Sequence, residues 1–331
     1  MILNTQEKFY SFYELERRKI DKRLKAILKN RKPVSLYSPG SYILSSSGKR
    51  LRPLLVLFSC RSVGGKLSDA YNAAVAVELL HNFTLVHDDI MDNADKRRGF
   101  ATLHKKYDLS TAILVGDSLL SVAYENLLKN LNSNTIPVVA EFTKGLVEVC
   151  EGQSLDKEFE LKSSVTIAEY KLMIAKKTAA MIEMCCKVGG YIGKGTKKEI
   201  DALSKFGRNI GIAFQIQDDL LDAVADESEF GKFVGGDLME GKKTYLFLKA
   251  LEIAKGSDKK MLELVSRNKG ITKNKINAYL DIYKRLGVFN LAKKEVKKYT
   301  TKALKTLKII KRKEDRELFY NLADFLIGRN K

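Results

Sequence analysis

The sequence predicts an all-α fold, built as a single large helical domain over residues 1–331. Apolar residues recur at three and four spacing through most of the chain, and no segment shows sustained β alternation. The chain has four prolines, and none lies after residue 137, which favours long helices over a turn-rich β fold. No linker or low-complexity tract interrupts the 331 residues.

The expected elements follow in chain order. Up to residue 40, the sequence predicts one amphipathic helix and then a loop that closes near SLYSPG, residues 35–40. From Lys49 onward, apolar periodicity predicts a succession of helices separated by short breaks. The longest of these helices are expected over residues 71–92, 110–131, 165–193 and 200–226. A glycine-rich loop is expected at residues 231–241, with further helices up to the C-terminus.

Composition restricts the class of protein. No run approaches the roughly 18 consecutive apolar residues of a membrane span, and the N-terminus lacks the order of a secretory signal. The four cysteines lack metal-ligand spacing, so we expect buried, reduced thiols in a cytoplasmic protein. The formal net charge of +19 would suit nucleic acid. The basic residues of 293–313, however, alternate with apolar ones at helical spacing, as on a solvated helix face. The repeated interleaving of aromatic and basic residues that is typical of a single-strand binder is absent, since Tyr299 is the one aromatic residue in this segment.

Two copies of the pattern DDxxD carry the first chemical signal, at residues 88–92 and 218–222. On a helix, positions i and i+4 lie about 40° apart and one turn along the axis. The first and last aspartates of each copy therefore project together: Asp88 with Asp92, and Asp218 with Asp222. Each pair offers hard oxygen ligands to Mg²⁺, which prefers one or two carboxylates together with substrate phosphates. One DDxxD alone often marks a solvated helix end, but both copies end apolar helices, where aspartate is unfavourable to the macrodipole.

Basic residues accompany both acidic motifs. Lys49 and Arg52 lie three apart at the entry of a helix, as a phosphate clamp requires. His81 lies seven residues before Asp88 on the same face, and it is either a core histidine or a ligand. The other candidates are Arg97 and Arg98 after the first motif, Lys177 and Thr178 inside an apolar helix, and Lys232 and Lys242 around GKFVGGDLMEGK. Such clusters could hold two diphosphates, one bridged by metals and one bound mainly by Arg and Lys.

Taken together, these motifs resemble those of the trans-isoprenyl diphosphate synthases, the polyprenyl synthetase family. The resemblance covers nearly the whole chain in the family's order. It rests on GKRLRP (48–53), ELLHNFTLVHDDIMDNADKRRG (78–99), GQSLD (152–156), KKTA (176–179), FQIQDDLLD (214–222) and GKFVGGDLMEGKKT (231–244). The resemblance implies an all-α bundle around a deep central cavity, usually as a homodimer. It also implies Mg²⁺-dependent head-to-tail condensation of isopentenyl diphosphate with an allylic diphosphate, namely dimethylallyl, geranyl or farnesyl diphosphate.

The resemblance also assigns roles to individual residues. The residues implied to bind the diphosphate of isopentenyl diphosphate are Lys49, Arg52, His81 and Arg98. Asp88 with Asp92 would bind two Mg²⁺ ions and Asp218 with Asp222 another, which gives about three ions per active site. The residues implied to hold the allylic diphosphate with these ions are Arg97, Lys177, Thr178, Gln215, Lys232 and Lys242. The four aspartates and Lys177 are the implied catalytic residues.

Three positions depart from the family pattern, because Ala101, Phe233 and Leu246 replace prolines that are usual there. None of the three would supply a ligand, so they bear on loop rigidity rather than on chemistry. No position of the catalytic motifs is lost, which argues against a non-catalytic regulatory subunit.

Product length in this family is usually limited by bulky residues before the first acidic motif. Phe83 and Thr84 combine one aromatic with a small neighbour, which resembles synthases of the twenty-carbon geranylgeranyl diphosphate. Core packing is the alternative role of Phe83, and farnesyl diphosphate or longer polyprenyl diphosphates are the alternative products. A terpene cyclase or a head-to-head condensing enzyme would lack the clamp of Lys49, Arg52 and His81. A basic nucleic-acid-binding protein would explain the net charge but not the two aspartate motifs.

Overall fold

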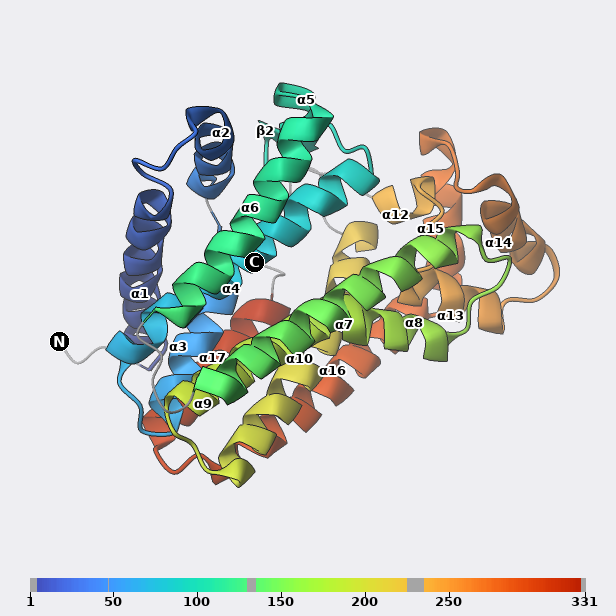
Figure 1. Cartoon of the computed structure of the whole chain (residues 1–331). Coiled ribbons are helices and arrows are strands. Elements are labelled where there is room, and N and C mark those ends of the chain that lie inside the picture. Colours follow the sequence, from blue (N-terminus) through green and yellow to red (C-terminus); the bar gives the residue numbers. More distant parts are fainter. Residues whose placement is uncertain (1–4, 47, 130–134, 225–234, 329–331) are drawn as a thin grey trace. The chain divides into compact units, whose positions relative to one another are not determined.

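The computed structural model describes residues 5–46, 48–129, 135–224 and 235–328, and these are almost entirely helical (Figure 1). The all-α prediction is confirmed. Over the described ranges, the only strands are β1 (Lys96–Arg97) and β2 (Phe100–Ala101), which pair antiparallel. No helix in those ranges combines the length and the apolar character needed to cross a membrane.

The chain divides into two compact units. The first comprises residues 1–143, 184–203 and 309–321, and the second comprises residues 144–183, 204–308 and 322–331. Four helices contribute residues to both units: α7 (Thr135–Leu161), α9 (Ala180–Ile192), α10 (Lys197–Val224) and α17 (Lys313–Ile327). A single domain over residues 1–331 stays a prediction.

The first unit is built around two strongly buried helices. The complete helices of this unit are, in chain order, α1 (Thr5–Ile27), α2 (Val34–Ser45), α3 (Leu51–Ser62), α4 (Leu67–Met91), α5 (Leu103–Lys106) and α6 (Leu109–Leu128), and the two buried ones are α3 and α4. Helices α3 and α6 both pack against α4 (Figure 1). Every side chain from Pro53 to Cys60 of α3 is buried, and so is most of α4 from Ala70 to Leu80. These helices are apolar on all sides because they form the core of the unit.

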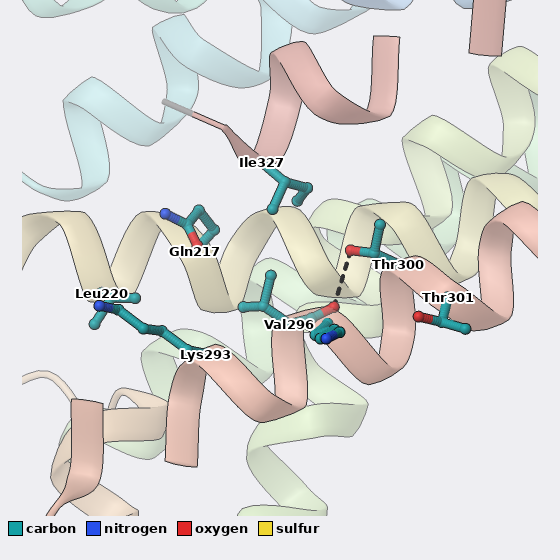
Figure 2. A pocket seen from close by; sticks show the side chains of 8 residues that line it. Gln217, Leu220, Lys293, Val296, Thr300, Thr301 and Ile327 are labelled. Carbon is teal, nitrogen blue, oxygen red and sulfur yellow. Dashed lines mark hydrogen bonds between the residues drawn. The ribbon is translucent and has the colours of Figure 1, made fainter. Parts of the chain in front are cut away.

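The second unit has its own apolar core, which gathers residues of α8, α10, α13, α15 and α16. Its remaining elements are α8 (Ile167–Ile174), the π-helical turn η1 (Ala175–Ala179), α12 (Gly236–Met239), α13 (Tyr245–Ile253), α14 (Gly256–Asn268), the 3-10 turn η2 (Lys273–Lys275), α15 (Ile276–Arg285) and α16 (Val288–Thr306). The 3-10 turn η3 (Leu307–Ile309) crosses the unit boundary. A cavity of about 360 Å³ lies between α10, α16 and the end of α17 (Figure 2).

The long predicted helices agree with α4, α6 and α10 to within a few residues. The predicted helix over 165–193 is divided, because the π-helical turn η1 separates α8 from α9. Residues 130–131 and 225–226 of the predicted helices, and residues 231–234 of the predicted loop, lie outside the described residues. The rest of that loop is partly helical, because Gly236–Met239 forms α12.

The expected loop near residues 35–40 is wrong, because helix α2 covers this segment and contains Pro39. Pro39 and Gly40 are both buried, and a Cβ on Gly40 would lie 2.9 Å from Cδ1 of Leu28. Close packing of α2 therefore outweighs the low helix propensity of proline and glycine.

The prediction of buried cysteines is correct for Cys60, Cys185 and Cys186 but wrong for Cys150, which is exposed. Cys150 follows the buried Val149 on α7. Successive helix residues point about 100° apart, so the side chain after a buried one can face solvent.

Candidate active site

The first aspartate motif lies at the C-terminal end of α4. The helix ends at Met91, but the backbone N–H of Asp92 still donates to the carbonyl oxygen of Asp88 at 2.9 Å. Helical register therefore extends through Asp92 and keeps Asp88 and Asp92 on one face. Asp92 is exposed and the Asp88 side chain is 22% exposed, with Oδ1 of Asp88 buried, so solvent reaches the Asp92 carboxylate and part of the Asp88 side chain.

The middle residue of this motif, Asp89, points into the protein instead. It is 3% exposed and accepts a hydrogen bond from Nε of Arg97 at 2.6 Å. Burial raises the pKa of Asp89, and the positive charge of Arg97 opposes that rise. Nη2 of Arg97 also lies 3.4 Å from Oδ2 of Asp88. Arg97 is predicted to hold the allylic diphosphate. Its contacts with Asp89 and Asp88 keep it beside the first motif.

A short hairpin presents Arg97 and Arg98. In it, Lys96 pairs with Ala101 and Arg97 pairs with Phe100. The two loop residues, Arg98 and Gly99, have φ of 52° and 82°. Positive φ at both central positions is the requirement of the tight hairpin turn that matches strand twist. Glycine meets this requirement easily, whereas a side chain such as that of Arg98 is uncommon there, and such positions cluster at functional sites.

Arg52 and His81, both predicted to bind isopentenyl diphosphate, lie in contact. Nη1 of Arg52 is 3.2 Å from Nε2 of His81. Burial holds the pKa of His81 well below its ordinary value, and the positive charges of nearby arginines, Arg52 first, act in the same direction. His81 is therefore neutral near pH 7, and its Nε2 can accept from Arg52 when Nδ1 carries the proton.

Arg98 belongs to the same cluster of positive charge. Arg98 is exposed as a whole residue, but neighbouring atoms desolvate its guanidinium and lower its pKa. The charges of Arg50, Arg97 and Arg52 lower this pKa further, while Glu78 opposes them. Like charges at this density disfavour one another unless an anion is bound among them. The cluster is suited to a multiply charged ligand such as a diphosphate.

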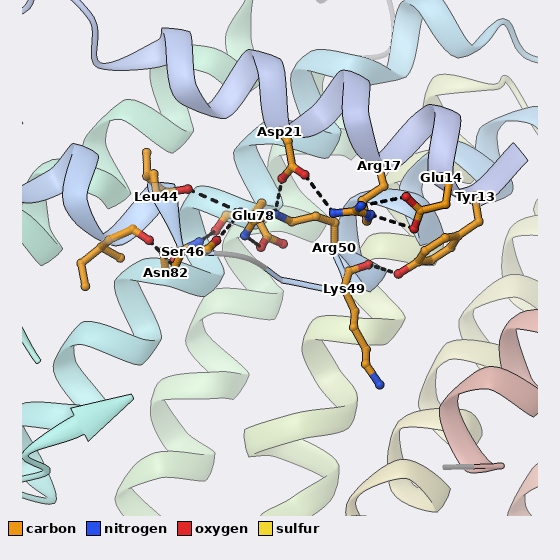
Figure 3. A network of polar contacts seen from close by, with 11 residues as sticks. Tyr13, Glu14, Arg17, Asp21, Leu44, Ser46, Lys49, Arg50, Glu78 and Asn82 are labelled. Carbon is orange, nitrogen blue, oxygen red and sulfur yellow. Dashed lines mark hydrogen bonds and ion pairs between the residues drawn. The ribbon is translucent and has the colours of Figure 1, made fainter. Parts of the chain in front are cut away.

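Arg50, which was not among the predicted site residues, organises the loop before α3 (Figure 3). It precedes α3 with a φ of 46° and is buried. Its guanidinium donates to Oδ1 of Asp21 and to Oε1 of Glu78, each at 2.8 Å. Figure 3 shows the side chain of Lys49 pointing away from this network. Arg50 thus anchors the backbone between Lys49 and Arg52, and because its partners are distant in sequence, no local pattern indicates this role.

The second aspartate motif lies near the end of α10. Oδ2 of Asp222 accepts from the backbone N–H of Asp237 at 3.0 Å, so Asp222 contacts the start of α12. Asp219, the middle residue, is 5% exposed and Oδ2 accepts from the Tyr170 hydroxyl at 2.5 Å and from the Tyr245 backbone N–H at 3.0 Å. The middle aspartate is again bound by the protein itself, while Asp218 is partly exposed.

Lys177 and Thr178 lie in the π-helical turn η1. A Cβ on Gly152 of α7 would lie 2.1 Å from the backbone nitrogen of Lys177, so this turn packs closely on α7. Nζ of Lys177 donates to Oδ2 of Asp156 at 2.6 Å. The Thr178 hydroxyl donates to Oε1 of Gln215 at 2.8 Å. Single π-helical turns occur frequently at functional sites, and here the turn carries the predicted pair.

The remaining candidate cations of this unit differ in their placement. Lys242 is exposed, and its Nζ lies 2.6 Å from Oε2 of Glu240 and 3.8 Å from Oδ1 of Asp237. Burial raises the pKa of Asp237 well above its ordinary value, and the neighbouring Asp222 and Asp219 raise it further. Lys232, like Phe233, lies outside the described residues.

Phe83 and Thr84 occupy α4 one turn before the first motif. The Phe83 ring lies 4.7 Å from the ring of His87, measured between centroids. The Thr84 hydroxyl donates to the carbonyl oxygen of His81 at 2.8 Å. A Cβ on Gly116 of α6 would lie 2.2 Å from Nε2 of His87, so that ring also packs closely on α6. The role of Phe83 in product length stays a prediction.

The donor chemistry of the two outer aspartate pairs fits Mg²⁺. Each pair presents carboxylate oxygens, which are the hard ligands that Mg²⁺ takes together with phosphate oxygens and water. Within the described part of the chain, no group of three or more His, Cys, Asp or Glu residues could hold a metal by itself. The pairs predicted from the sequence are Asp88 with Asp92 and Asp218 with Asp222.

Comparison with known proteins identifies the family. The family model named Polyprenyl synthetase matches residues 33–283. A short chain isoprenyl diphosphate synthase from Methanothermobacter thermautotrophicus is 38% identical over 310 residues, which cover 93% of this chain and 95% of that protein. A geranylgeranyl diphosphate synthase from Sulfolobus acidocaldarius is 41% identical over 306 residues, which cover 89% and 91%. The crystal structure of geranylgeranyl pyrophosphate synthetase from Pyrococcus horikoshii Ot3 matches with a TM-score of 0.92 at 38% identity, over 99% of this chain and 100% of that one. The chain therefore belongs to the polyprenyl synthetase family.

Proposed function

We propose that this prenyltransferase condenses isopentenyl diphosphate with allylic diphosphates to give geranylgeranyl diphosphate. The relatives from Sulfolobus acidocaldarius and Pyrococcus horikoshii Ot3 that are named for this product support the proposal. The observation that carries it is the arginine cluster around neutral His81, next to an accessible aspartate pair at the end of α4. Two diphosphates of different binding mode suit these two arrangements.

Members of the family are generally Mg²⁺-dependent. The outer aspartates would hold about three Mg²⁺ ions, which when bound supply positive charge to the departing diphosphate. Asp88 with Asp92 and Asp218 with Asp222 are the residues that would hold these ions. The side chains proposed to complete this binding site are Arg97, Lys177, Thr178, Gln215, Lys232 and Lys242.

The reaction separates charge, and the side chains are suited to stabilise that separation. The bond between the allylic carbon and the diphosphate oxygen breaks, so the diphosphate takes the electron pair and an allylic carbocation remains. Lys177 and Arg97 would neutralise the leaving diphosphate as its charge develops. Thr178, bonded to Gln215, would be oriented toward the same ligand.

The second substrate then forms the new bond. Lys49, Arg52, His81 and Arg98 would hold isopentenyl diphosphate by its diphosphate group. The π bond of isopentenyl diphosphate attacks the allylic carbocation, and a proton leaves the adjacent carbon for the released diphosphate. His81 is suited to bind the substrate rather than to accept the proton, because its pKa is held well below the ordinary value and its Nε2 already contacts Arg52. An apolar cavity would exclude water that would otherwise capture the carbocation.

The product is proposed to stop at twenty carbons. Phe83, fixed against His87, would block elongation one turn below the first aspartate pair. If the space for the growing prenyl chain is shorter than this, the alternative product is farnesyl diphosphate. If that space is longer, the alternative is a longer polyprenyl diphosphate.

A homodimer is proposed on the exposed apolar residues of α6. Ile113 and Leu114 are 40% and 59% exposed, and Leu128 near the end of the helix is 51% exposed. Exposed apolar residues grouped on one helix mark interaction surfaces. Light scattering of the purified chain tests this point, and a monomer at all concentrations would contradict it.

The proposed activity is tested with purified protein, labelled isopentenyl diphosphate and each of three allylic diphosphates. We expect Mg²⁺-dependent formation of geranylgeranyl diphosphate that EDTA abolishes, with dephosphorylated products separated by chromatography. Farnesyl or longer products would correct the product length only. Absence of any prenyl product with every allylic diphosphate would refute the proposal, and a hydrocarbon formed without isopentenyl diphosphate would indicate a cyclase.

A further inference from the structure

Helix α1 carries a buried tyrosine whose hydroxyl is not explained by core packing. Phe9, Tyr13, Ile20 and Leu24 recur at four and seven spacing and form the buried stripe of this helix. The Tyr13 ring lies 5.9 Å from the Phe9 ring between centroids, and the residue is 4% exposed. A phenylalanine would supply the same apolar contacts, so the hydroxyl needs a polar partner of its own. Burial raises the pKa of Tyr13 to about 12, so the hydroxyl is protonated at neutral pH and can donate.

The acceptor for this hydroxyl lies in the loop that carries Lys49 (Figure 3). The Tyr13 hydroxyl donates to the carbonyl oxygen of Lys49 at 2.5 Å, across 36 residues of sequence. The α-helical pattern of α3 cannot supply this donor, because the residue four positions after Lys49 is Pro53, which has no N–H. Helix α1 therefore holds a peptide group that the helix following the loop leaves without an i+4 donor.

This peptide group adjoins a residue in a strained conformation. The carbonyl of Lys49 belongs to the peptide that links Lys49 to Arg50, and Arg50 has a φ of 46°. The left-handed region is unfavourable for a residue with a Cβ, so such a conformation persists only where the surrounding contacts hold it. Asp21 and Glu78 hold the side chain of Arg50, and Tyr13 holds the peptide before it. Without the Tyr13 hydroxyl, this peptide could rotate and relieve the strain.

The loop that Tyr13 holds lies beside the groups proposed to bind isopentenyl diphosphate. A Cβ on Gly48 would lie 3.1 Å from Nη1 of Arg98, so Arg98 packs against the backbone of this loop. Figure 3 shows the Lys49 side chain pointing away from the Arg50 network. Because a rotation of the Lys49 peptide would turn this side chain, the Tyr13 hydroxyl controls the direction in which Lys49 presents its charge.

We infer that Tyr13 is a positioning residue for isopentenyl diphosphate, so that helix α1 supports the binding site of the second substrate. The inference rests on the proposed function. Tyr13 acts through Lys49 rather than on the substrate itself, because its hydroxyl holds the Lys49 peptide and this peptide directs the Lys49 side chain. Lys49 would bind the diphosphate equally in the ground state and in the transition state. Loss of the Tyr13 hydroxyl therefore raises KM for isopentenyl diphosphate with little effect on kcat.

The test variant is Tyr13→Phe, which removes the hydroxyl and keeps the ring. The matched control is Tyr71→Phe, because the Tyr71 hydroxyl of α4 also donates to a partner on α1 at 2.5 Å, namely Oε2 of Glu16, and not to the loop. Initial rates with isopentenyl diphosphate varied at saturating allylic diphosphate measure KM and kcat. We expect Tyr13→Phe to raise KM for isopentenyl diphosphate at least about fivefold, with KM for the allylic diphosphate and kcat changed by less than about twofold. Tyr71→Phe should leave all three quantities unchanged.

A double-mutant cycle with Lys49→Met separates positioning from a general loosening of α1. If Tyr13 acts through Lys49, Tyr13→Phe should raise KM for isopentenyl diphosphate by less than about twofold once Lys49 is already replaced. An undiminished effect in the Lys49→Met background would overturn the action through Lys49. An equal rise of KM in Tyr13→Phe and Tyr71→Phe would also overturn the inference, because weaker packing of α1 would then be the cause.

Titration calorimetry of the full chain with isopentenyl diphosphate measures the same effect without turnover. Tyr13→Phe should bind at least about fivefold more weakly than wild type, and Tyr71→Phe should bind as wild type does. A wild type that forms prenyl product, together with one shared affinity in all three proteins, would overturn the inference and leave the proposed function intact. A wild type that forms no prenyl product with any allylic diphosphate would instead refute the proposed function itself.

Discussion

Replacing Arg50 by methionine should destabilise the first unit and weaken the binding of isopentenyl diphosphate. Methionine keeps the Cβ and much of the volume, so the backbone at φ 46° experiences the same steric constraint. What is lost is the guanidinium that binds Asp21 and Glu78 (Figure 3). The loop between Lys49 and Arg52 would then lose the contacts that fix it.

The size of the effect follows from the burial of the partners. Side chains of Arg50 and Glu78 are 2% and 4% exposed, so the variant removes the cation that is hydrogen-bonded to the buried Glu78 carboxylate. Breaking a buried ion pair in this way costs about 3–5 kcal/mol. Asp21 adds little, because it is 24% exposed and keeps its contact with Arg17 at 3.2 Å.

Urea denaturation measures the free energy of unfolding, and steady-state kinetics measures KM for isopentenyl diphosphate. Arg17→Met is the control, since its partners are partly exposed and the expected loss is below about 1 kcal/mol. The pair Arg50→Met with Glu78→Gln should recover part of the stability, because it removes the uncompensated charge. If Arg50→Met cost no more than Arg17→Met, or if the double variant recovered nothing, the buried pair would not be the cause.

Four further predictions concern the aspartates, the product length, the histidine and the π-helical turn. Asp88→Asn should lower kcat by at least about 100-fold in a Mg²⁺-saturated assay, whereas Asp95→Asn, at a side chain 82% exposed, should leave kcat unchanged. Phe83→Ser should lengthen the product seen by chromatography, and an unchanged product would make Phe83 a core-packing residue. Folding lowers the pKa of His81, so the unfolded chain binds that proton more tightly and wild type loses stability as the pH falls below about 6.5. Urea unfolding near pH 7 and near pH 5 should show this loss, up to about 1.4 kcal/mol per pH unit, in wild type but not in His81→Gln. Gly152→Ala should cost roughly 1–3 kcal/mol in urea unfolding and lower kcat, because its Cβ would lie 2.1 Å from the backbone of the turn.

Local patterns predict most of this fold because most of its helices are long and strongly periodic. Helices α4 and α10 were located to within a few residues on that basis. Helix α2 was missed because Pro39 and Gly40 are poor helix formers, and packing against distant residues such as Leu28 decides their conformation. The π-helical turn was missed because one wider turn shifts the apolar period too little to be visible in the sequence.

In the candidate site too, local patterns predict some residues, whereas the roles of others depend on contacts that are distant in the sequence. The aspartate pairs follow from helix geometry alone, since residues four apart share a face. The role of Arg50 cannot be predicted from helix geometry, because its partners Asp21 and Glu78 are 29 and 28 residues away in the sequence. The contact of Arg97 with Asp89 depends on a hairpin of two-residue strands, which periodicity cannot indicate.

The middle aspartate of each DDxxD motif explains why the pattern contains three acids when only two share a face. The second residue lies about 100° from the first on a helix, so it points toward the neighbouring elements. Asp89 is bound there by Arg97, and Asp219 by the Tyr170 hydroxyl and the Tyr245 backbone. Each contact ties the helix end to a different segment, the hairpin in one unit and α8 with α13 in the other. The middle acid therefore fixes the helix end, and this rigidity keeps the outer pair, on which the proposed metal binding depends, in a constant geometry.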